Sequence, residues 1–493
     1  MLPLPLRERA GVRGKDSRLS RLTWYDCAGL RVSLVSVVAL LGTVAPAVGG
    51  GFVPGLLSRD PLHASLSAPG ALGLDSSSLM RPTGMLTDSA VVALEYNAEN
   101  LLRTRTGDAL TADITTRGRA ESLFVPLRIT KQPTTFAISR ASSNASAYYQ
   151  DDDTGTQLTW RSASSAWAIN HPIGLTRIGI AGSHYSGLAP GQSHLPRSAF
   201  KVFTGWTPVT LDFAGRDTVL QVARTLSRGS EVCVSAGSGS TRLSTVFGQS
   251  GNSISIPAYA DTTQYGIDAA KQITGKLSLA AGYSRSSGSG SSPIYRNGVS
   301  SGKLLYGPSY HQLSASLKYQ RRPSSLWEAG FVSSKWNLNL RGLGLRGGDL
   351  GISLRPFNDR IDFDADCSLG LSFLHVGMQR QVSDKWRLGW RYKLARLESD
   401  LNADYAGRAF FGLINVTGSY GQSLLTTRLH DLELSARYAR KAVSFEARLE
   451  QVIPFGSDGP GAATSGPGPG SGPSERGKST GGTSLSFTSS YAF

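Results

Sequence analysis

The chain ends in Thr483-Ser-Leu-Ser-Phe-Thr-Ser-Ser-Tyr-Ala-Phe493, and this stretch decides the fold. Every second residue, counted back from the end, belongs to one face: Phe493, Tyr491, Ser489, Phe487 and Leu485. The positions between them hold only alanine, serine and threonine. Side chains alternate between the two faces of a β-strand, so this period of two predicts a strand with one largely apolar face and one small polar face.

A final strand with a terminal phenylalanine, and a tyrosine two residues before it, resembles the carboxy-terminal strand of bacterial outer-membrane β-barrels. The resemblance covers residues 483–493, and Ser489 departs from it because a larger apolar residue is usual there. It implies that Phe487, Tyr491 and Phe493 form the signal that the barrel-assembly machinery recognises. It also implies that the protein resides in the outer membrane of a Gram-negative-type bacterium.

The same alternation recurs upstream, in residues 277–283, 313–319, 327–331, 361–373, 386–394, 432–438 and 443–449. One strand cannot distinguish a soluble sandwich from a barrel, because its polar face can look outward to water or inward to a lumen. Export of the chain, the terminal strand and aromatic residues at strand ends together favour the barrel. We therefore predict an all-β fold, a transmembrane, antiparallel, up-and-down β-barrel of about 16 strands, within a range of roughly 14 to 20.

A secretory signal peptide is predicted near the start of the chain. Three arginines between residues 18 and 31 precede the apolar run 32–41, which is followed by Ala45-Pro46-Ala47. Basic residues, a short hydrophobic run and an Ala-x-Ala end characterise such a peptide. The run is shorter than the about 20 residues that a membrane-spanning helix needs. We assign residues 1–47 to this region, with a start codon downstream of Met1 as an alternative.

Residues 48–110 are predicted to form an irregular segment that plugs the barrel. Thr87 or Asp88 can cap a short helix there. The apolar face of this helix would comprise Val91, Leu94, Leu101 and Leu102. The segment is weakly similar to the amino-terminal hatch of the long-chain fatty-acid transporter family of fourteen-stranded barrels, in which an Asp-rich approach leads to an Asn-Pro-Ala motif. This chain has Asp88-Ser89-Ala90 and Asn97-Ala98, without the proline.

The barrel itself is assigned to residues 111–493. Long external loops are expected near 286–305, 400–423 and 456–482. Tight periplasmic turns are expected at 382–385 and 439–442. Short periplasmic turns combined with longer external loops are the usual asymmetry of bacterial outer-membrane barrels.

The composition excludes several classes of protein. Hydrophobic residues make up 40% of the chain and the mean hydropathy is -0.14, which is too polar for a bundle of membrane helices. The formal charge of +16 is scattered, without a run of five like charges, so no nucleic-acid partner is expected. The expected partners are outer-membrane lipids, the barrel-assembly machinery and an unidentified small solute, and no cofactor is expected.

Charged residues on the polar faces of the strands are expected to line the lumen. They are Arg355, Asp362, Asp364, Asp366, Arg387, Arg391, Lys393, Glu433, Arg437, Glu446 and Arg448. A turn at 439–442 would place Glu433 opposite Arg448, and Arg437 opposite Ser444. A turn at 356–360 would place Asp362 beside Arg355. We expect these charges mainly to form structural ion pairs, and a selectivity lining of the pore is the alternative.

No metal centre or catalytic centre is predicted. Asp151, Asp152 and Asp153 are a weak candidate for calcium, because adjacent carboxylates lack the spacing of alternating ligands, and a solvated loop tip is favoured. Ser309 and His311 lie close in sequence, but nothing supplies the orienting acid that a nucleophilic enzyme needs. The three cysteines predict neither a zinc site nor a disulfide framework.

Together these features predict an outer-membrane channel or transporter for small solutes, with hydrophobic solutes as one class, and not an enzyme. A structural or surface-recognition barrel that acts through its external loops is the alternative. An outer-membrane hydrolase is the least favoured of the three functions.

Overall fold

The computed structural model describes residues 90–106, 109–127, 134–150, 155–194, 206–227, 229–249, 252–345, 361–409, 414–440, 443–458, 478–480 and 482–492. Every regular element in these ranges is a β-strand, and none of these residues belongs to a helix long and apolar enough to cross a membrane. In chain order the strands are β1 (Val91–Thr106), β2 (Ala109–Leu127), β3 (Thr134–Gln150), β4 (Gly155–Ile173), β5 (Thr176–His194), β6 (Trp206–Ser227), β7 (Ser230–Gln249), β8 (Asn252–Thr274), β9 (Leu277–Arg296), β10 (Val299–Arg322), β11 (Ser325–Leu345), β12 (Ile361–Gln381), β13 (Trp386–Ala409), β14 (Ile414–Arg440), β15 (Val443–Asp458), β16 (Lys478–Thr480) and β17 (Gly482–Ala492).

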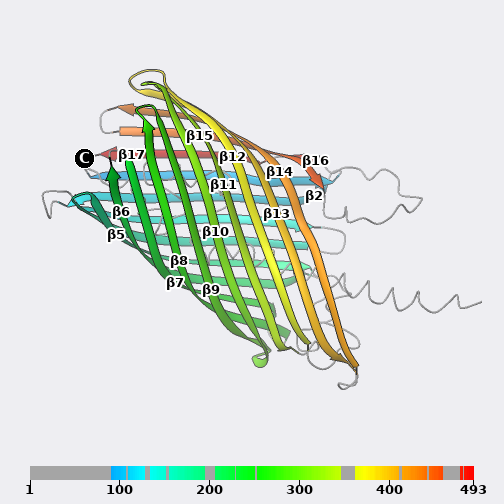
Figure 1. Cartoon of the computed structure of the whole chain (residues 1–493). Helices are drawn as coiled ribbons and strands as arrows, with labels where there is room; N and C mark the ends of the chain where they lie inside the picture. Colours follow the sequence, from blue (N-terminus) through cyan, green and yellow to red (C-terminus); the bar gives the residue numbers. More distant parts are fainter. Residues whose placement is uncertain are drawn as a thin grey trace, which may run out of the picture.

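The strands pair in an antiparallel, up-and-down order that returns to its starting point. From β1 to β15 each strand pairs with the next one in the chain, and β15 then pairs with β17. The first strand also pairs with the last, with Val91 opposite Ala492. The strands of the near wall cross those of the far wall in projection, as tilted strands on opposite walls of a barrel do (Figure 1). The predicted antiparallel β-barrel is confirmed.

Two of the seventeen strands in the described residues are pieces of one strand. Both β16 and β17 pair with β1, and Arg103 lies opposite Thr480 while Asn100 lies opposite Thr483. The two pairs follow one unbroken register, so β17 continues the line of β16. The ring therefore consists of sixteen strands across the described part of the chain, the number expected from the sequence.

Several expectations about the connections are wrong. Strands β9 and β10 run through most of the supposed loop 286–305, and only Asn297 and Gly298 separate them. Strands β13 and β14 likewise occupy most of 400–423. Strand β15 extends into 456–482 and β16 and β17 fill its end, while residues 459–477 lie outside the described ranges.

The short turns were predicted better. Residues 382–385 connect β12 to β13 as expected. Strand β14 continues to Arg440 and β15 begins at Val443, so the expected turn at 439–442 is shorter than predicted. The turn between β9 and β10 has positive φ angles at Asn297 (49°) and Gly298 (82°). Asparagine and glycine tolerate this conformation, which makes Asn-Gly suited to a two-residue hairpin turn.

The helix expected between Thr87 and Leu102 is also wrong, because Val91–Thr106 forms strand β1. The barrel therefore begins at Val91 and not at residue 111. Leu94 and Tyr96 are exposed on one face of this strand, in step with the period of two. The signal peptide and the rest of the expected plug, up to residue 89, lie outside the described residues.

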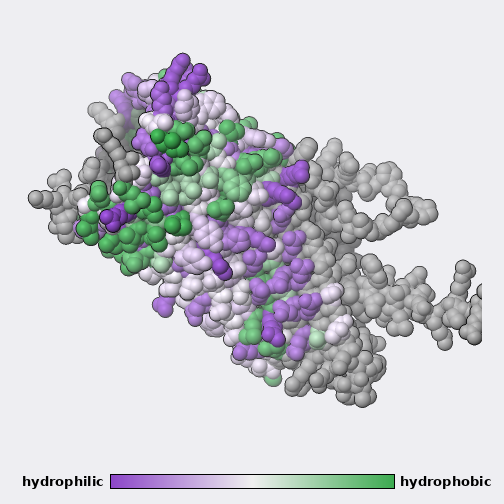
Figure 2. Space-filling view, viewed as in Figure 1, coloured by the Kyte–Doolittle hydropathy of each residue, from purple (hydrophilic) through white to green (hydrophobic). Residues whose placement is uncertain are grey.

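The strands are much longer than a membrane requires. A tilted strand crosses the hydrocarbon core with about 9 to 11 residues, whereas β11 has 21 and β14 has 27. We call the end of the barrel where β17 ends the C-terminal rim, and the opposite end the far rim. On the visible face, hydrophobic residues gather towards the C-terminal rim and hydrophilic ones towards the far rim (Figure 2). Exposed large apolar side chains occur on strands around the ring, from Leu94 on β1 to Phe487 on β17, so the outer surface has an apolar belt over part of its height.

Candidate functional site

Strand β11 shows how the inner and outer surfaces of the barrel change along its height. Near the C-terminal rim its outward residues are apolar and include Trp327 and Phe331, and its inward residue Glu328 is buried. Towards the far rim the order is reversed. Lys335, Asn339 and Arg341 are exposed on the outer face, while the inward residue Leu340 is buried. The adjacent apolar residues Phe331 and Val332 mark the change of phase.

Strand β12 repeats this reversal. Leu374 and Val376 are exposed on its outer face near the C-terminal rim, and His375 is buried between them on the inner face. Further along, the inward residues Ala365 and Cys367 are buried. The wall is therefore polar inside where it is apolar outside, and apolar inside where it is polar outside.

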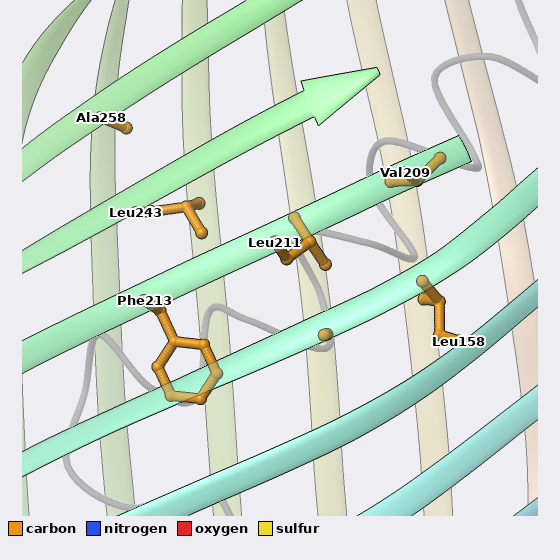
Figure 3. Packing of buried hydrophobic residues seen from close by; sticks show 7 residues of the cluster. Leu158, Val209, Leu211, Phe213, Leu243 and Ala258 are labelled. Carbon is orange, nitrogen blue, oxygen red and sulfur yellow. The ribbon is translucent and has the colours of Figure 1, made fainter. Parts of the chain in front are cut away.

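The apolar part of the interior forms two clusters that share one tyrosine, and we call them together the distal apolar cluster. The larger one comprises Leu158, Ala189, Val209, Leu211, Phe213, Leu243 and Ala258, with Tyr185, Phe247 and Tyr306 packed against it. The smaller one comprises Leu340 and Ala365, with Leu304, Leu338 and Tyr306 packed against it. Leu158, Val209, Leu211, Phe213, Leu243 and Ala258 come from neighbouring strands of one wall (Figure 3). Val209 and Leu211 are each only 1% exposed, and burying such a side chain contributes about 1.5–3 kcal/mol.

Glycines let the large rings of this cluster lie flat against the wall. A Cβ atom at Gly187 of β5 would overlap the ring of Phe213 from β6. A Cβ atom at Gly290 of β9 would overlap the ring of Tyr306 from β10, whose hydroxyl donates a hydrogen bond to the backbone oxygen of Tyr259. The glycines therefore fix where the aromatic side chains of the cluster lie.

A second cluster, which we call the proximal ion-pair cluster, lies on the inner face nearer the C-terminal rim. It comprises Glu328 on β11, His375 on β12, Arg391 and Lys393 on β13, Asp431 and Glu433 on β14, and Glu450 on β15. Each of these residues is no more than 6% exposed. Buried charges need partners, because transfer of an unpaired charge out of water is costly.

Lys393 is the centre of the proximal ion-pair cluster. Its Nζ atom donates hydrogen bonds to Asp431 Oδ2 and Glu450 Oε1, each at 2.9 Å, and lies 3.8 Å from Glu433 Oε2. Arg391 Nη1 donates to Glu433 Oε2 at 3.3 Å. One lysine therefore holds three carboxylates together across β13, β14 and β15.

Glu328 and His375 extend this cluster to β11 and β12. Glu328 Oε2 lies 3.9 Å from Arg391 Nη2, and Glu328 Oε1 lies 3.6 Å from His375 Nε2. A small cavity beside them is lined by Glu328, Arg391, Glu433 and Gly377, among others. The cluster thus ties five consecutive strands together.

Several of the charges that the sequence assigned to the lumen do lie on the inner face. Arg391, Lys393 and Glu433 are buried there. Further inward-facing residues are half-buried or, at the rim, exposed: Arg437, Glu446, Arg448 and Arg387. Arg448 Nε donates a hydrogen bond of 2.6 Å to Glu446 Oε1.

The expectation for Asp362, Asp364 and Asp366 is wrong. All three are exposed on the outer face of β12, near the far rim, and the alternating Ala365 and Cys367 are buried inside. The outer surface is polar at this height, so the rule that polar residues face the lumen no longer applies. Arg355, the supposed partner of Asp362, lies outside the described residues.

The expected register between β14 and β15 is also wrong, although the faces are as predicted. Glu433 lies opposite Glu450, and Arg437 lies opposite Glu446. Arg448 lies opposite Ser435 and is one pair removed from Glu433 on the same face. The shorter turn moves every partner by two residues.

Sequence reasoning missed four members of the proximal ion-pair cluster: Glu328, His375, Asp431 and Glu450. Asp431 has the same parity as Glu433, and Glu450 the same parity as Arg448, so the alternation itself contains the signal for these two. His375 stands at the phase reversal of β12, where parity counted from the start of the strand no longer separates polar from apolar residues. The distal apolar cluster was missed for the same reason.

The remaining candidates from the sequence are the possible metal ligands, the cysteines and the residues of the terminal strand. No group of three or more His, Cys, Asp or Glu side chains that could hold a metal ion is found among them. Asp151, Asp152, Asp153 and Phe493 lie outside the described ranges. Cys233 and Cys367 are buried free thiols. Phe487 and Tyr491 are exposed on the outer face of β17, within the apolar belt.

No protein-family model matches the sequence, and no curated protein is significantly similar to it. Solved structures are similar in fold. A FadL homologue from Pseudomonas aeruginosa is 12% identical, with a TM-score of 0.41, and the match covers 88% of this chain and 94% of that one. The toluene transporter TodX from Pseudomonas putida is 10% identical, with a TM-score of 0.39 and coverage of 87% and 92%.

A further match is CdiB from Acinetobacter baumannii, which is 11% identical with a TM-score of 0.37. It covers 83% of this chain, and this chain spans only 60% of that structure. Similarity at this level assigns no substrate to the chain.

Proposed function

We propose that this barrel spans an outer membrane and carries small hydrophobic solutes through its interior. The observation that supports this proposal is the reversal of polarity along β11 and β12. The apolar belt on the outside matches the hydrocarbon core of a bilayer. Beyond that belt the inner wall is apolar although the outer wall is polar, and the distal apolar cluster is where a hydrophobic solute would bind.

A channel for ions or sugars has no need of this arrangement, because its solutes interact with polar walls and water. Ligand sites for apolar molecules are lined mainly by hydrophobic and aromatic side chains with a few polar groups. The distal apolar cluster has this composition, and the hydroxyls of Tyr185 and Thr241 provide a hydrogen-bonded pair at 2.7 Å beside it. The proximal ion-pair cluster lies between this region and the C-terminal rim, so we expect low ion conductance.

The entry of N-phenyl-1-naphthylamine into bacterial cells tests the proposal. This apolar probe fluoresces once it leaves water, and an intact outer membrane slows its entry. Cells that express the full chain should take it up several-fold faster than cells with an empty vector. Equal rates at equal levels of folded barrel would contradict the proposed function.

Two substitutions on β6, Leu211→Asn and Leu220→Asn, test the interior of the barrel and its lipid-facing surface separately. Leu211 is 1% exposed and belongs to the distal apolar cluster, while Leu220 is 51% exposed on the outer face of β6. We expect Leu211→Asn to slow probe entry and Leu220→Asn to leave it unchanged in barrels that reach the membrane. Fast entry in both variants would mean that the distal apolar cluster is not the solute path.

A further inference from the structure

Three basic residues, two of them charged at neutral pH, form a row on the outer surface of the barrel, on three adjacent strands. Arg285 of β9 lies opposite His311 of β10, and His311 lies opposite Lys335 of β11. Arg285 and Lys335 are exposed and His311 is half-buried. Directly opposed residues on one face have their Cβ atoms about 4.5–5.5 Å apart, and like charges in this arrangement destabilise a sheet.

No acidic side chain lies directly beside this row in the pairing register; the first acid along it, Glu398 of β13, lies beyond Gly370 and pairs with Arg396. Tyr265 of β8 lies opposite Arg285, and Gly370 of β12 lies opposite Lys335. On the same outer face, the positions two residues above and below the row are Tyr283, Ser287, Leu313, Ser309, Ser333 and Asn337. None of these three basic residues forms an ion pair with a residue in the described part of the chain.

Several other outward cations of the barrel have nearby acids. Arg341, six residues further along β11, lies opposite Asp364. Arg396 pairs with Glu398, and Arg119 pairs with Glu121 at 2.5 Å. The cationic row is therefore a local excess of positive charge with no directly adjacent acid in the described part of the chain.

The position of the row indicates what neutralises it. On the side of the C-terminal rim the row borders apolar outward residues, Tyr283 and Leu313, with Leu279 and Leu317 beyond them. On the side of the far rim it borders Ser287, Ser309 and Asn337, which are neutral hydrogen-bonding residues. The cations thus stand at the edge of the lipid-facing belt, at the height of a leaflet's headgroups.

We propose that the row Arg285, His311 and Lys335 is a binding site for a phosphorylated glycolipid of the surrounding outer leaflet. Phosphate groups would accept charge-assisted hydrogen bonds from Arg285 and Lys335 and a hydrogen bond from the His311 ring. Acyl chains would lie on the apolar column below, and sugar hydroxyls would face the serines and the asparagine above. This inference uses the membrane placement in the proposed function, but it is independent of any transported solute.

The test uses the full chain in detergent micelles and diphosphorylated, hexa-acylated lipid A as the probe, with binding measured by native mass spectrometry. The variant Arg285→Gln/Lys335→Gln removes two charges of the row. The control Arg242→Gln/Arg341→Gln removes two exposed outward charges elsewhere, where Arg242 faces the ring of Tyr259 and Arg341 faces Asp364. We expect at least a tenfold rise in Kd for the first variant and less than a twofold change for the control.

Two further ligands identify the group that is recognised. Dephosphorylated lipid A should bind the unaltered protein at least tenfold more weakly, and inorganic pyrophosphate should not displace lipid A at equal concentration. Equal binding of dephosphorylated lipid A, displacement by pyrophosphate, or an equal loss in the control variant would each overturn the glycolipid site.

Folding and transport are monitored separately in the same variants. Both double variants should keep the mobility shift of a folded barrel on unheated gels, and Arg285→Lys/Lys335→Arg should bind lipid A as the unaltered protein does. Failure of the conservative variant to bind would also contradict the proposal. Entry of N-phenyl-1-naphthylamine should not change in either double variant. The lipid-binding result can therefore be interpreted even if the proposed transport is wrong.

Discussion

Lys393→Met tests whether the proximal ion-pair cluster stabilises the barrel through its central lysine. Lys393 is 2% exposed, and its ammonium group lies 2.9 Å from Asp431 and from Glu450 and 3.8 Å from Glu433. Methionine keeps the length of the side chain and removes the charge, so three buried carboxylates lose their shared cation. Removing one partner of a buried ion pair typically costs about 3–5 kcal/mol, because the remaining charge is left without compensation.

The matched control is Arg396→Met on the same strand. Arg396 pairs with Glu398 on the outer face, where the two side chains are 56% and 41% exposed. Exposed pairs contribute about 0–1 kcal/mol, because water screens both charges. The measurement is the free energy of unfolding in urea for barrels refolded into lipid vesicles, with the unheated gel shift reporting the folded fraction.

A second substitution identifies the cause of the loss. Glu433 keeps Arg391 as a partner, so Lys393→Met leaves Asp431 and Glu450 without a cation. Glu450→Gln in this background removes one of these two charges, so it should restore about 1–3 kcal/mol, within the range of coupling between residues in contact. The same change in the unaltered protein should destabilise it. Our account of the cluster is refuted if Lys393→Met costs no more than Arg396→Met, or if the second substitution only adds to the loss.

Three other perturbations follow from the turn, the wall and the terminal strand. Gly298→Ala should destabilise the barrel by about 1–2 kcal/mol in the same urea titration, because Gly298 has a φ of +82°. Its control is Gly275→Ala, which should be close to neutral. Gly275 is equally free of neighbours within 4 Å but has no positive φ. Gly290→Val should cost about 1–3 kcal/mol by displacing the ring of Tyr306, and Gly307→Val, where a Cβ atom meets only ordinary contacts, is its control. Deletion of Phe493 should leave export intact but reduce the folded barrel in membrane fractions, and normal levels of the heat-shifted band would show that the terminal residue is not part of the assembly signal.

The sequence predicted the strands best where the outer face touches lipid. In β17 and in the first half of β13, the residues Leu485, Phe487, Trp386 and Leu388 are exposed apolar groups at every second position. Strands of soluble sheets alternate as well, but only a bilayer requires the outer, exposed face of each spanning strand to be apolar. This physical requirement makes the belt visible in the sequence.

The strands were missed where neither face requires large apolar groups. In β9, residues 286–292 are serine and glycine only, and this composition is typical of loops. The structure continues the strand there because glycine leaves space for the ring of Tyr306 from β10. Small residues that serve ring packing cannot be distinguished from loop residues by composition alone.

Register was harder to predict than orientation, for a geometric reason. A shift of one residue in the centre of a turn changes the sum of paired residue numbers by two, which preserves the face of every side chain. Glu433 was therefore assigned to the inner face and yet given the wrong partner, Arg448 in place of Glu450. Ion-pair partners depend on turn length, which the charges themselves do not encode.

The reversal of polarity along the wall has its own signature in the sequence. A strand that keeps one phase of alternation has its apolar residues on one face throughout. In β12 the apolar residues occupy odd positions up to Phe373 and then even positions from Leu374, and in β11 the change falls between Phe331 and Val332. Two adjacent apolar residues thus mark the height at which the alternation changes phase. On one side of this height the apolar residues face lipid, and on the other side they face the interior of the barrel. This pair distinguishes a barrel with an apolar inner compartment from one with a uniformly polar lumen, and it explains why Asp364 faces outward while Lys393 faces inward on the neighbouring strand.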